Sequence, residues 1–206
     1  MMGRAGYRWM MGGPSAPGWM RGGRLPGSMM GTSTDPGKIM GALSANAPGP
    51  QVSPQQAARL GGQIPAEASI GRARNIITFT GTSIGMAAVA SAAGGPDDTF
   101  RIAGLVNSAV VPAAARVSIE VINADPGTAH GLVITTSNPV SSWMPMMTAT
   151  PAFTGSALWF LGNPTPAGMH TGTLTFTATR PGTYHYLCPV PGQAQKGMTG
   201  TFTSTS

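Results

Sequence analysis

Cysteine, histidine and charged residues are scarce in this chain of 206 residues. It has one cysteine and three histidines, and charged residues make up 9% of it, whereas glycine (30 residues) and proline (19 residues) are frequent. A single cysteine excludes a framework of internal disulfides and a dinuclear metal centre that needs two cysteine ligands. The composition favours a β-rich domain with polar turns over a helical bundle.

Long apolar runs are also missing. No stretch approaches the roughly 18 apolar residues that a membrane-spanning helix needs. The first 13 residues lack the apolar segment of a signal peptide. An exported protein that is written without its cleaved leader would have this appearance.

The formal charge of +6 belongs to the N-terminal part of the chain. Residues 1–74 hold eight basic and two acidic side chains, whereas residues 75–206 hold four of each and are neutral. No basic patch with interleaved aromatic side chains accompanies this charge, so nucleic-acid binding is not expected. The acidic residues are too few and too scattered for a catalytic carboxylate pair, and the Gly-x-Ser-x-Gly motif of serine hydrolases is absent.

The N-terminal third of the chain differs in composition from the rest. Residues 1–50 form a basic extension rich in Met, Gly and Pro, and eight of the fourteen methionines lie in the first forty residues. We expect disorder here, because the segment cannot bury enough apolar surface to offset chain entropy. It is either a flexible linker or a segment whose thioethers capture Cu(I). Residues 51–74 are predicted to form one short helix and a linker, with Ser53 as the N-cap and Pro54 in the first helical position.

Residues 75–206 are predicted to form one β domain. Apolar and polar residues alternate at 116–123 and 173–179, which is typical of half-buried strands. Further strands are expected at residues 75–80, 99–103, 106–111, 132–136, 183–188 and 199–203. Seven or eight short strands at this spacing indicate an all-β sandwich or barrel.

The one cysteine lies in the most informative stretch, residues 184–198. Cys188 ends a strand-like run, and Met198 follows ten positions later on a loop rich in Pro and Gly. His130 stands where a polar loop enters the strand expected at 132–136. A thiolate and a thioether from one loop, with an imidazole from another strand, suit a soft, redox-active copper ion.

Three stretches make the chain resemble a known family: residues 123–130, 143–147 and 184–198. They are similar to the sulfocyanin and rusticyanin branch of the cupredoxins, with sulfocyanin closer, and the resemblance covers about residues 53–206. It implies a Greek-key β-sandwich outside the cytoplasm, periplasmic or at the cell surface. It also implies one-electron transfer through a single type 1 copper ion per chain.

The family holds its copper with two histidines, one cysteine and one methionine. Matched by position, His130, Cys188 and Met198 are three of these ligands, and Gln193 stands where the family has its second histidine. An amide oxygen is a harder and weaker copper ligand than an imidazole. Three interpretations stay open: an engineered ligand replacement, a natural variant whose Gln193 binds copper, and a site that has lost tight copper binding.

The remaining candidate residues are expected to be structural. Strand alternation places His185 on the opposite face from Cys188, and His170 precedes a strand. An apolar patch is expected beside the site, either as packing or as a docking rim for a redox partner. Its members are Trp143, Met144, Pro145, Met146, Met147, Phe153, Trp159 and Phe160.

These patterns predict an electron-transfer protein rather than an enzyme. Cys188 is flanked by Leu187 and Pro189, so the histidines that a multicopper oxidase needs beside its cysteine are absent. The alternative function is an extracytoplasmic copper carrier or buffer that uses the N-terminal methionines for Cu(I). We expect a monomer whose redox partner is a protein such as a cytochrome or a terminal oxidase, and the expectation extends to peripheral association with a membrane.

Overall fold

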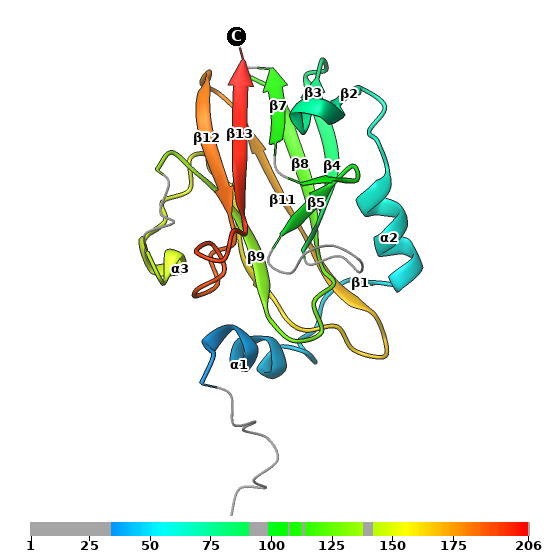
Figure 1. The fold of residues 1–206 in the computed structure, drawn as a ribbon, viewed down its shortest axis with the longest axis vertical. Coiled ribbons are helices and arrows are strands. Elements are labelled where there is room, and N and C mark those ends of the chain that lie inside the picture. The colour runs from blue at the N-terminus through cyan, green and yellow to red at the C-terminus, as the bar shows by residue number, and fades with distance from the viewer. Residues whose placement is uncertain (1–33, 91–98, 107, 113, 138–141, 206) are drawn as a thin grey trace, which may run out of the picture. The chain divides into compact units, whose positions relative to one another are not determined.

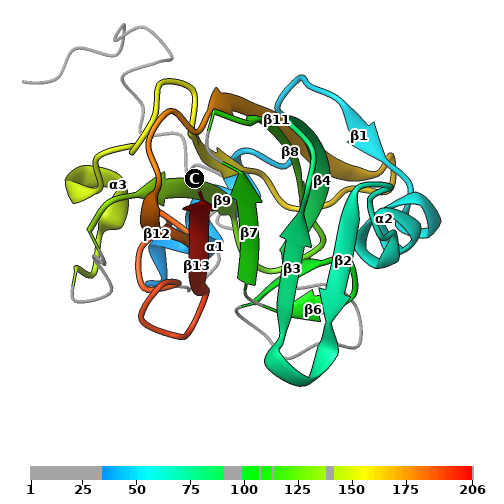
Figure 2. The same ribbon diagram turned by 90° about the horizontal axis from the view of Figure 1, so that it is seen from above.

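The computed structural model describes residues 34–90, 99–106, 108–112, 114–137 and 142–205, and within them the chain forms two stacked β-sheets (Figures 1 and 2). The six-stranded sheet contains, in spatial order, β1 (Gln51–Val52), β11 (Met169–Thr177), β8 (Arg116–Asn123), β4 (Ser83–Ala90), β5 (Phe100–Ile102) and β6 (Leu105–Val106). The seven-stranded sheet contains β10 (Ala157–Leu161), β9 (His130–Thr135), β12 (Gly182–Leu187), β13 (Thr199–Thr205), β7 (Ser108–Pro112), β3 (Ile76–Phe79) and β2 (Ala68–Gly71). The predicted all-β sandwich is therefore confirmed.

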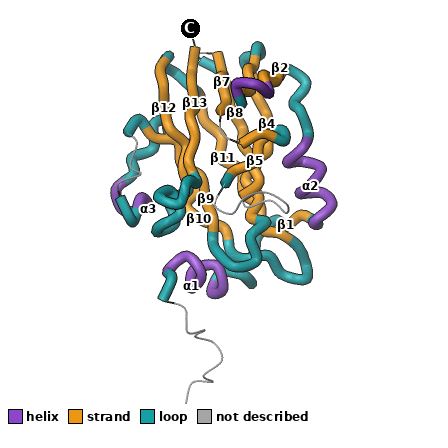
Figure 3. The backbone as a smooth tube through the Cα atoms, viewed as in Figure 1, coloured by secondary structure: helices purple, strands orange, loops and turns teal. Residues whose placement is uncertain are grey.

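Helices cover the outside of the sandwich in Figure 3. They are α1 (Pro36–Leu43), α2 (Pro54–Gly62), α3 (Pro145–Thr148) and the 3-10 helix η2 (Arg72–Arg74). The expectation of one short helix is correct for α2, which begins after Ser53 as predicted: the Ser53 hydroxyl accepts a hydrogen bond of 3.2 Å from Gln56 N–H. It is wrong for the described chain as a whole, which has three α-helices.

The main core lies between the two sheets and follows from strand alternation. In β8, Val117, Ile119 and Val121 are buried in this core, while Ser118 and Glu120 lie on the other face of the strand. Burying the apolar face of each sheet against the other removes it from water, at roughly 25 cal/mol for each Å² of apolar surface. The outer face of the six-stranded sheet carries a second, smaller cluster beneath α2, formed by Val52, Ala57, Val89 and Ile122.

Aromatic rings fill one part of the core. The Phe153 ring stacks on Phe176 with a centroid separation of 5.3 Å and contacts Tyr184 at 4.8 Å. The Tyr184 hydroxyl donates a hydrogen bond of 3.0 Å to the carbonyl of Arg180, four residues upstream. This is the tyrosine corner of Greek-key sandwiches, and it fixes the start of β12.

Two long strands were not foreseen from the sequence. β4 pairs in parallel with β8 along its whole length, from Ser83 beside Arg116 to Ala90 beside Asn123. Half of its eight residues are Ala or Gly, which have low β propensity, so its pairing depends on its neighbours. The edge strand β10 was missed as well, and it pairs with β9 across a register shift between Leu158 and Leu161.

Helix α1 lies inside the extension for which disorder was expected. Asp35 caps it by accepting a hydrogen bond of 2.9 Å from Gly37 N–H. The carbonyl of Gly37 accepts from Ala129 N–H at 3.0 Å, and the carbonyl of Gly41 accepts from Asn163 N–H at 3.0 Å. Tertiary hydrogen bonds thus order residues 34–50, while residues 1–33 lie outside the described part of the chain. The division at residues 50 and 74 stays a prediction.

We expect Gly41→Ala to destabilise the protein by about 1–3 kcal/mol, the usual cost of overpacking. A Cβ atom at Gly41 would lie 2.7 Å from the backbone nitrogen of Ala129 and would also meet the Asn163 side chain, so α1 would have to shift. Chemical denaturation measures the change in the free energy of unfolding.

Gly62→Ala is the matched control, because a Cβ atom there has no neighbour within 4 Å. It should leave stability unchanged or raise it by about 0.4–1 kcal/mol, since alanine restricts the unfolded chain. Equal effects of the two substitutions would contradict close packing of α1 against the loop that ends at Ala129.

Candidate metal centre

His130 is the first residue of β9, and it is fully buried. Its position is set by the neighbouring strand β10, where Leu161 lies opposite it in the ladder. The Nδ1 atom of its ring lies 3.7 Å from Sγ of Cys188. The structure therefore brings together two of the residues that the sequence predicted as ligands, although they are 58 positions apart.

The other ring nitrogen of His130 faces a carboxylate. Nε2 of His130 lies 2.9 Å from Oδ2 of Asp125. The loop that carries Asp125 is itself held by hydrogen bonds, from Gly127 N–H to Oδ1 of Asp125 at 2.7 Å and from Asp125 N–H to Oδ1 of Asn123 at 3.0 Å. Asp125 was not among the predicted site residues, although an acidic residue in the turn before His130 is a signal that could have identified it.

Asn123 anchors this loop to the sandwich. Its buried amide group lies within hydrogen-bonding distance of three carbonyls, those of Thr128 (2.9 Å), Gly162 (2.9 Å) and Leu161 (3.3 Å). One side chain thereby joins the end of β8, the loop before β9 and the end of β10. The loop before His130 and the neighbouring strand β10 are consequently both held in place.

The environment of His130 shifts its pKa. Burial disfavours the imidazolium ion and would lower the pKa, but hydrogen bonds and charge interactions with Asp125 and Cys188 outweigh burial and raise it from 6.5 to about 9. The pKa of Asp125 is lowered: burial raises it, but the hydrogen bond from His130, the backbone N–H groups of the loop and the charge of His130 together outweigh burial.

Cys188 follows β12 and begins the loop that closes this end of the sandwich. Its backbone N–H donates to the carbonyl of Met198 at 3.0 Å, and Met198 N–H donates to the carbonyl of Gln193 at 3.1 Å. Gln193 N–H in turn donates to the carbonyl of Val190 at 3.2 Å. The turn needs a left-handed backbone at Gly192, where φ is 78°. These bonds hold Cys188, Gln193 and Met198 close along one short loop.

All the predicted ligands are buried. Cys188 and Met198 are fully buried and belong to the main core. Gln193 is 1% exposed, and within the described residues its Oε1 atom has no hydrogen-bond partner. A buried amide oxygen without a partner costs about 1–3 kcal/mol, so this atom is a candidate ligand for something that the protein binds.

The segment 142–149 covers the ligand loop from outside. Met146 N–H donates to the carbonyl of Pro189 at 3.0 Å, and Gly192 N–H donates to the carbonyl of Trp143 at 2.9 Å. The Trp143 and Met147 side chains are exposed, at 50% and 75%. The expected patch divides in two, because Phe153 packs in the core whereas Trp159 and Phe160 are exposed on β10.

The two other histidines lie apart from this site. Nε2 of the buried His170 ring lies 2.7 Å from the carbonyl oxygen of Ala45. His170 therefore links the segment after α1 to β11. His185 is half-buried on β12, opposite Thr135 and Thr201 in the ladders. Both residues are thus placed as structural side chains.

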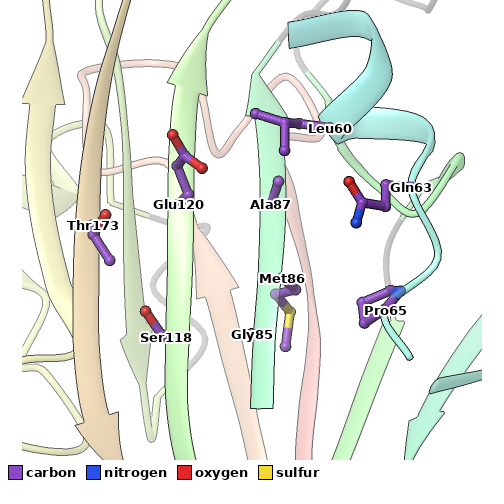
Figure 4. A pocket seen from close by; sticks show the side chains of 9 residues that line it. All are labelled: Leu60, Gln63, Pro65, Gly85, Met86, Ala87, Ser118, Glu120 and Thr173. Atoms are coloured by element: carbon purple, nitrogen blue, oxygen red, sulfur yellow. The ribbon is translucent and has the colours of Figure 1, made fainter. Parts of the chain in front are cut away.

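A cavity of about 320 Å³ occupies the outer face of the six-stranded sheet (Figure 4). Glu120 and Ser118 of β8 line it together with Leu60 of α2 and Gln63 beyond the helix. The residues that alternate with Glu120 in β8 point into the core, so this cavity lies across the sheet from the core that contains Cys188.

In the described part of the chain, no three His, Cys, Asp or Glu side chains gather as a metal site. The predicted ligand set does not form such a group, since two of its four members are Gln193 and Met198. No helix among the described residues is long and apolar enough to cross a membrane.

Known proteins resemble this chain in both sequence and structure. Rusticyanin of Acidithiobacillus ferrooxidans is 32% identical over 126 residues, which are 60% of this chain and 77% of that protein. The chain belongs to the rusticyanin family. Rusticyanin of Acidithiobacillus ferridurans is equally similar, but the chain spans only 64% of its length, as it does for another rusticyanin of Acidithiobacillus ferrooxidans. No family model matches the sequence.

Solved rusticyanins have the same fold. A structure of rusticyanin from Thiobacillus ferrooxidans superposes with a TM-score of 0.64 at 23% identity, over 76% of this chain and 96% of that one. A structure of reduced rusticyanin gives a TM-score of 0.61 at 25% identity, over 76% and 99%. The predicted cupredoxin fold is confirmed, and so is the resemblance to the rusticyanin branch. The closer likeness to sulfocyanin stays a prediction.

For the metal-free, reduced protein we expect the free energy of unfolding to fall as the pH rises from about 6.5 to about 9. The pKa of His130 is about 9 in the folded protein and 6.5 in the unfolded chain. Protonated His130 therefore stabilises the fold fully below pH 6.5, and this stabilisation is lost as the pH rises to about 9. Urea denaturation at a series of pH values measures this.

Asp125→Asn is the comparison for this experiment, because it removes a charge that raises the pKa of His130. The decline in stability should be shallower in the variant. A wild-type protein whose stability is constant across this pH range would contradict the ion pair between His130 and Asp125.

Proposed function

We propose that this protein carries single electrons through one copper ion held by His130, Cys188, Gln193 and Met198. The observation that supports this most is the approach of Nδ1 of His130 to Sγ of Cys188, at 3.7 Å, in a fully buried site. An imidazole, a thiolate and a thioether are the donors that copper prefers in electron-transfer sites. The protein is then an electron carrier and not an enzyme.

The residues present fit a copper ion. Cys188 and Met198 offer soft sulfur ligands, and Nδ1 of His130 faces Sγ of Cys188 while the carboxylate of Asp125 faces the other ring nitrogen. The buried Oε1 atom of Gln193 lacks a partner in the described structure, and a metal ligand bond would satisfy it. Gln193 is therefore proposed as the fourth ligand, in place of the second histidine of the family.

Copper bound here would supply a centre that cycles between Cu(I) and Cu(II). The protein residues keep that centre dry and rigid. Tyr186, two residues before Cys188, is buried with no hydrogen-bond partner for its hydroxyl among the described residues, and burial raises its pKa. The hydrogen bond from Cys188 to Met198 closes the loop. A closed loop and an apolar core limit rearrangement when the charge of the site changes.

Membership of the family supports a proposal for the cellular setting. We propose an extracytoplasmic protein, periplasmic or at the cell surface, that acts as a monomer. Its partner would be a redox protein such as a cytochrome or a terminal oxidase, and exposed Trp143 and Met147 offer an apolar approach beside the ligand loop. Peripheral membrane association and a closer relation to sulfocyanin belong to the same proposal.

A Cu(II) titration of the purified protein, followed by visible absorption and EPR, tests this function. We expect thiolate-to-copper absorption that saturates at one Cu(II) per chain and disappears in Cys188→Ser. The band ratio should differ from that of an ordinary blue copper site, because an amide oxygen replaces one imidazole. An ordinary blue spectrum would refute ligation by Gln193, and no thiolate band at all would refute the copper site.

Gln193→His should strengthen Cu(II) binding by more than about tenfold, since even partners of a ligand alter metal affinity about 10–100-fold. It should also shift the spectrum towards that of an ordinary blue copper site. Gln195→His is the matched control: Gln195 lies on the same loop but is exposed, so this histidine should leave the spectrum and the affinity unchanged. If both variants behave alike, Gln193 is not in the coordination shell.

Copper carriage is a second candidate function, and the sequence of the extension favours it. Seven methionines lie within residues 1–33, and thioethers bind Cu(I). If these residues carry copper, the full-length protein should bind several Cu(I) ions. Replacing the seven methionines with leucine should reduce binding to one Cu(I) and leave the Cu(II) spectrum unchanged. Equal Cu(I) stoichiometry in both proteins would refute this candidate.

A further inference from the structure

We propose that Asp125 is a positioning residue that strengthens the copper ligand His130. This inference rests on the copper site proposed above and goes beyond its ligands. The carboxylate of Asp125 lies 2.9 Å from Nε2 of His130, while Nδ1 of the same ring lies 3.7 Å from Sγ of Cys188. The imidazole is thus held between the carboxylate of Asp125 and the sulfur atom of Cys188.

The carboxylate selects which nitrogen of His130 can bind a metal. A carboxylate oxygen only accepts hydrogen bonds, so Nε2 must carry the proton that it donates to Asp125. In the neutral imidazole the lone pair is then on Nδ1, which is the nitrogen beside Cys188. Histidines that bind metals usually donate their other N–H in this way, which fixes the ring orientation and makes the ligand more basic.

Asp125 is held too firmly for this to be a chance contact of a surface side chain. Its Oδ1 atom accepts from Gly127 N–H and its own N–H donates to Oδ1 of Asn123, while the Asn123 amide donates in turn to the carbonyls of Thr128 and Gly162. The side chain of Asp125 is only 22% exposed, so water screens the interaction weakly. The loop is therefore built to present this carboxylate to His130.

The negative charge of Asp125 matters most because the proposed site has one imidazole where the family has two. With Gln193 in place of the second histidine, His130 is the only nitrogen donor in the proposed set. A more basic His130 stabilises Cu(II) more than Cu(I), because the higher charge gains more from a stronger donor and a nearby anion. Asp125 should therefore lower the reduction potential and offset part of the Cu(II) affinity lost through the amide ligand.

Asp125→Asn tests the electronic part of the proposal, because asparagine keeps the shape and a hydrogen-bond acceptor but removes the charge. Cu(II) affinity should fall about 10–100-fold, as is typical when the partner of a metal ligand is changed. The potential should rise by about 59 mV for each tenfold loss of Cu(II) affinity relative to Cu(I). Direct electrochemistry and competition with a Cu(II) chelator measure the two quantities.

Glu120→Gln is the matched control. It removes the same charge from the face of β8 that lines the cavity in Figure 4, across the sheet from the core. It should leave the affinity and the potential unchanged. If Asp125→Asn also leaves both unchanged while the wild-type protein binds copper, the inference is wrong and the copper site stands.

The metal-free protein separates the two proposals. In ¹⁵N–¹H spectra of the wild-type imidazoles, Nε2 of His130 should carry a slowly exchanging proton that is lost in Asp125→Ala. Absence of this proton in the wild-type protein overturns the inference whatever the copper result. Its presence in a protein that does not bind Cu(II) supports the positioning role of Asp125 and overturns the copper site.

Discussion

The hydrogen bond from Cys188 N–H to the carbonyl of Met198 is the contact on which the arrangement of the site depends. It extends the ladder of β12 and β13 by one step beyond Leu187 and Thr199, so the loop between the strands starts and ends at the same point. The side chains of Cys188 and Met198, each with a sulfur atom, therefore stand at the two ends of the loop. Because the ladder is part of a seven-stranded sheet, the spacing of these donors is fixed by the fold as a whole rather than by the loop alone.

The second half of the site is held by a different device. His130 starts β9, and side chains shape the loop before it, above all those of Asn123 and Asp125. Helix α1 adds backbone contacts through Gly37 and Gly41, two glycines one helical turn apart. Their lack of side chains lets the helix approach that loop closely, so a segment that is far away in the sequence contributes to the rigidity of the site.

The contrast between α1 and the ligand loop explains what could be predicted. Cys188 and Met198 were identified from the sequence because their spacing on a Pro- and Gly-rich loop reflects local geometry. Helix α1 was missed because its few apolar residues do not offset chain entropy, and its order comes from contacts with the distant residues Ala129 and Asn163. β4 was missed for the same reason, since an Ala- and Gly-rich strand is specified by its neighbour β8. Local patterns therefore led to the proposed ligands but not to the segments that support them.

Gln193 shows why those supports matter for the chemistry. A site that had merely lost copper binding would be expected to relax, with the amide of Gln193 turning to solvent or bonding to a neighbour. Instead it is 1% exposed, and its oxygen has no partner in the described structure, while the loop around it keeps its turn at Gly192. The fold tolerates that unpaired oxygen beside the buried sulfur atoms of Cys188 and Met198 and the imidazole of His130, which faces Asp125. A binding role for the amide accounts for this arrangement, because a bound metal would supply the missing partner.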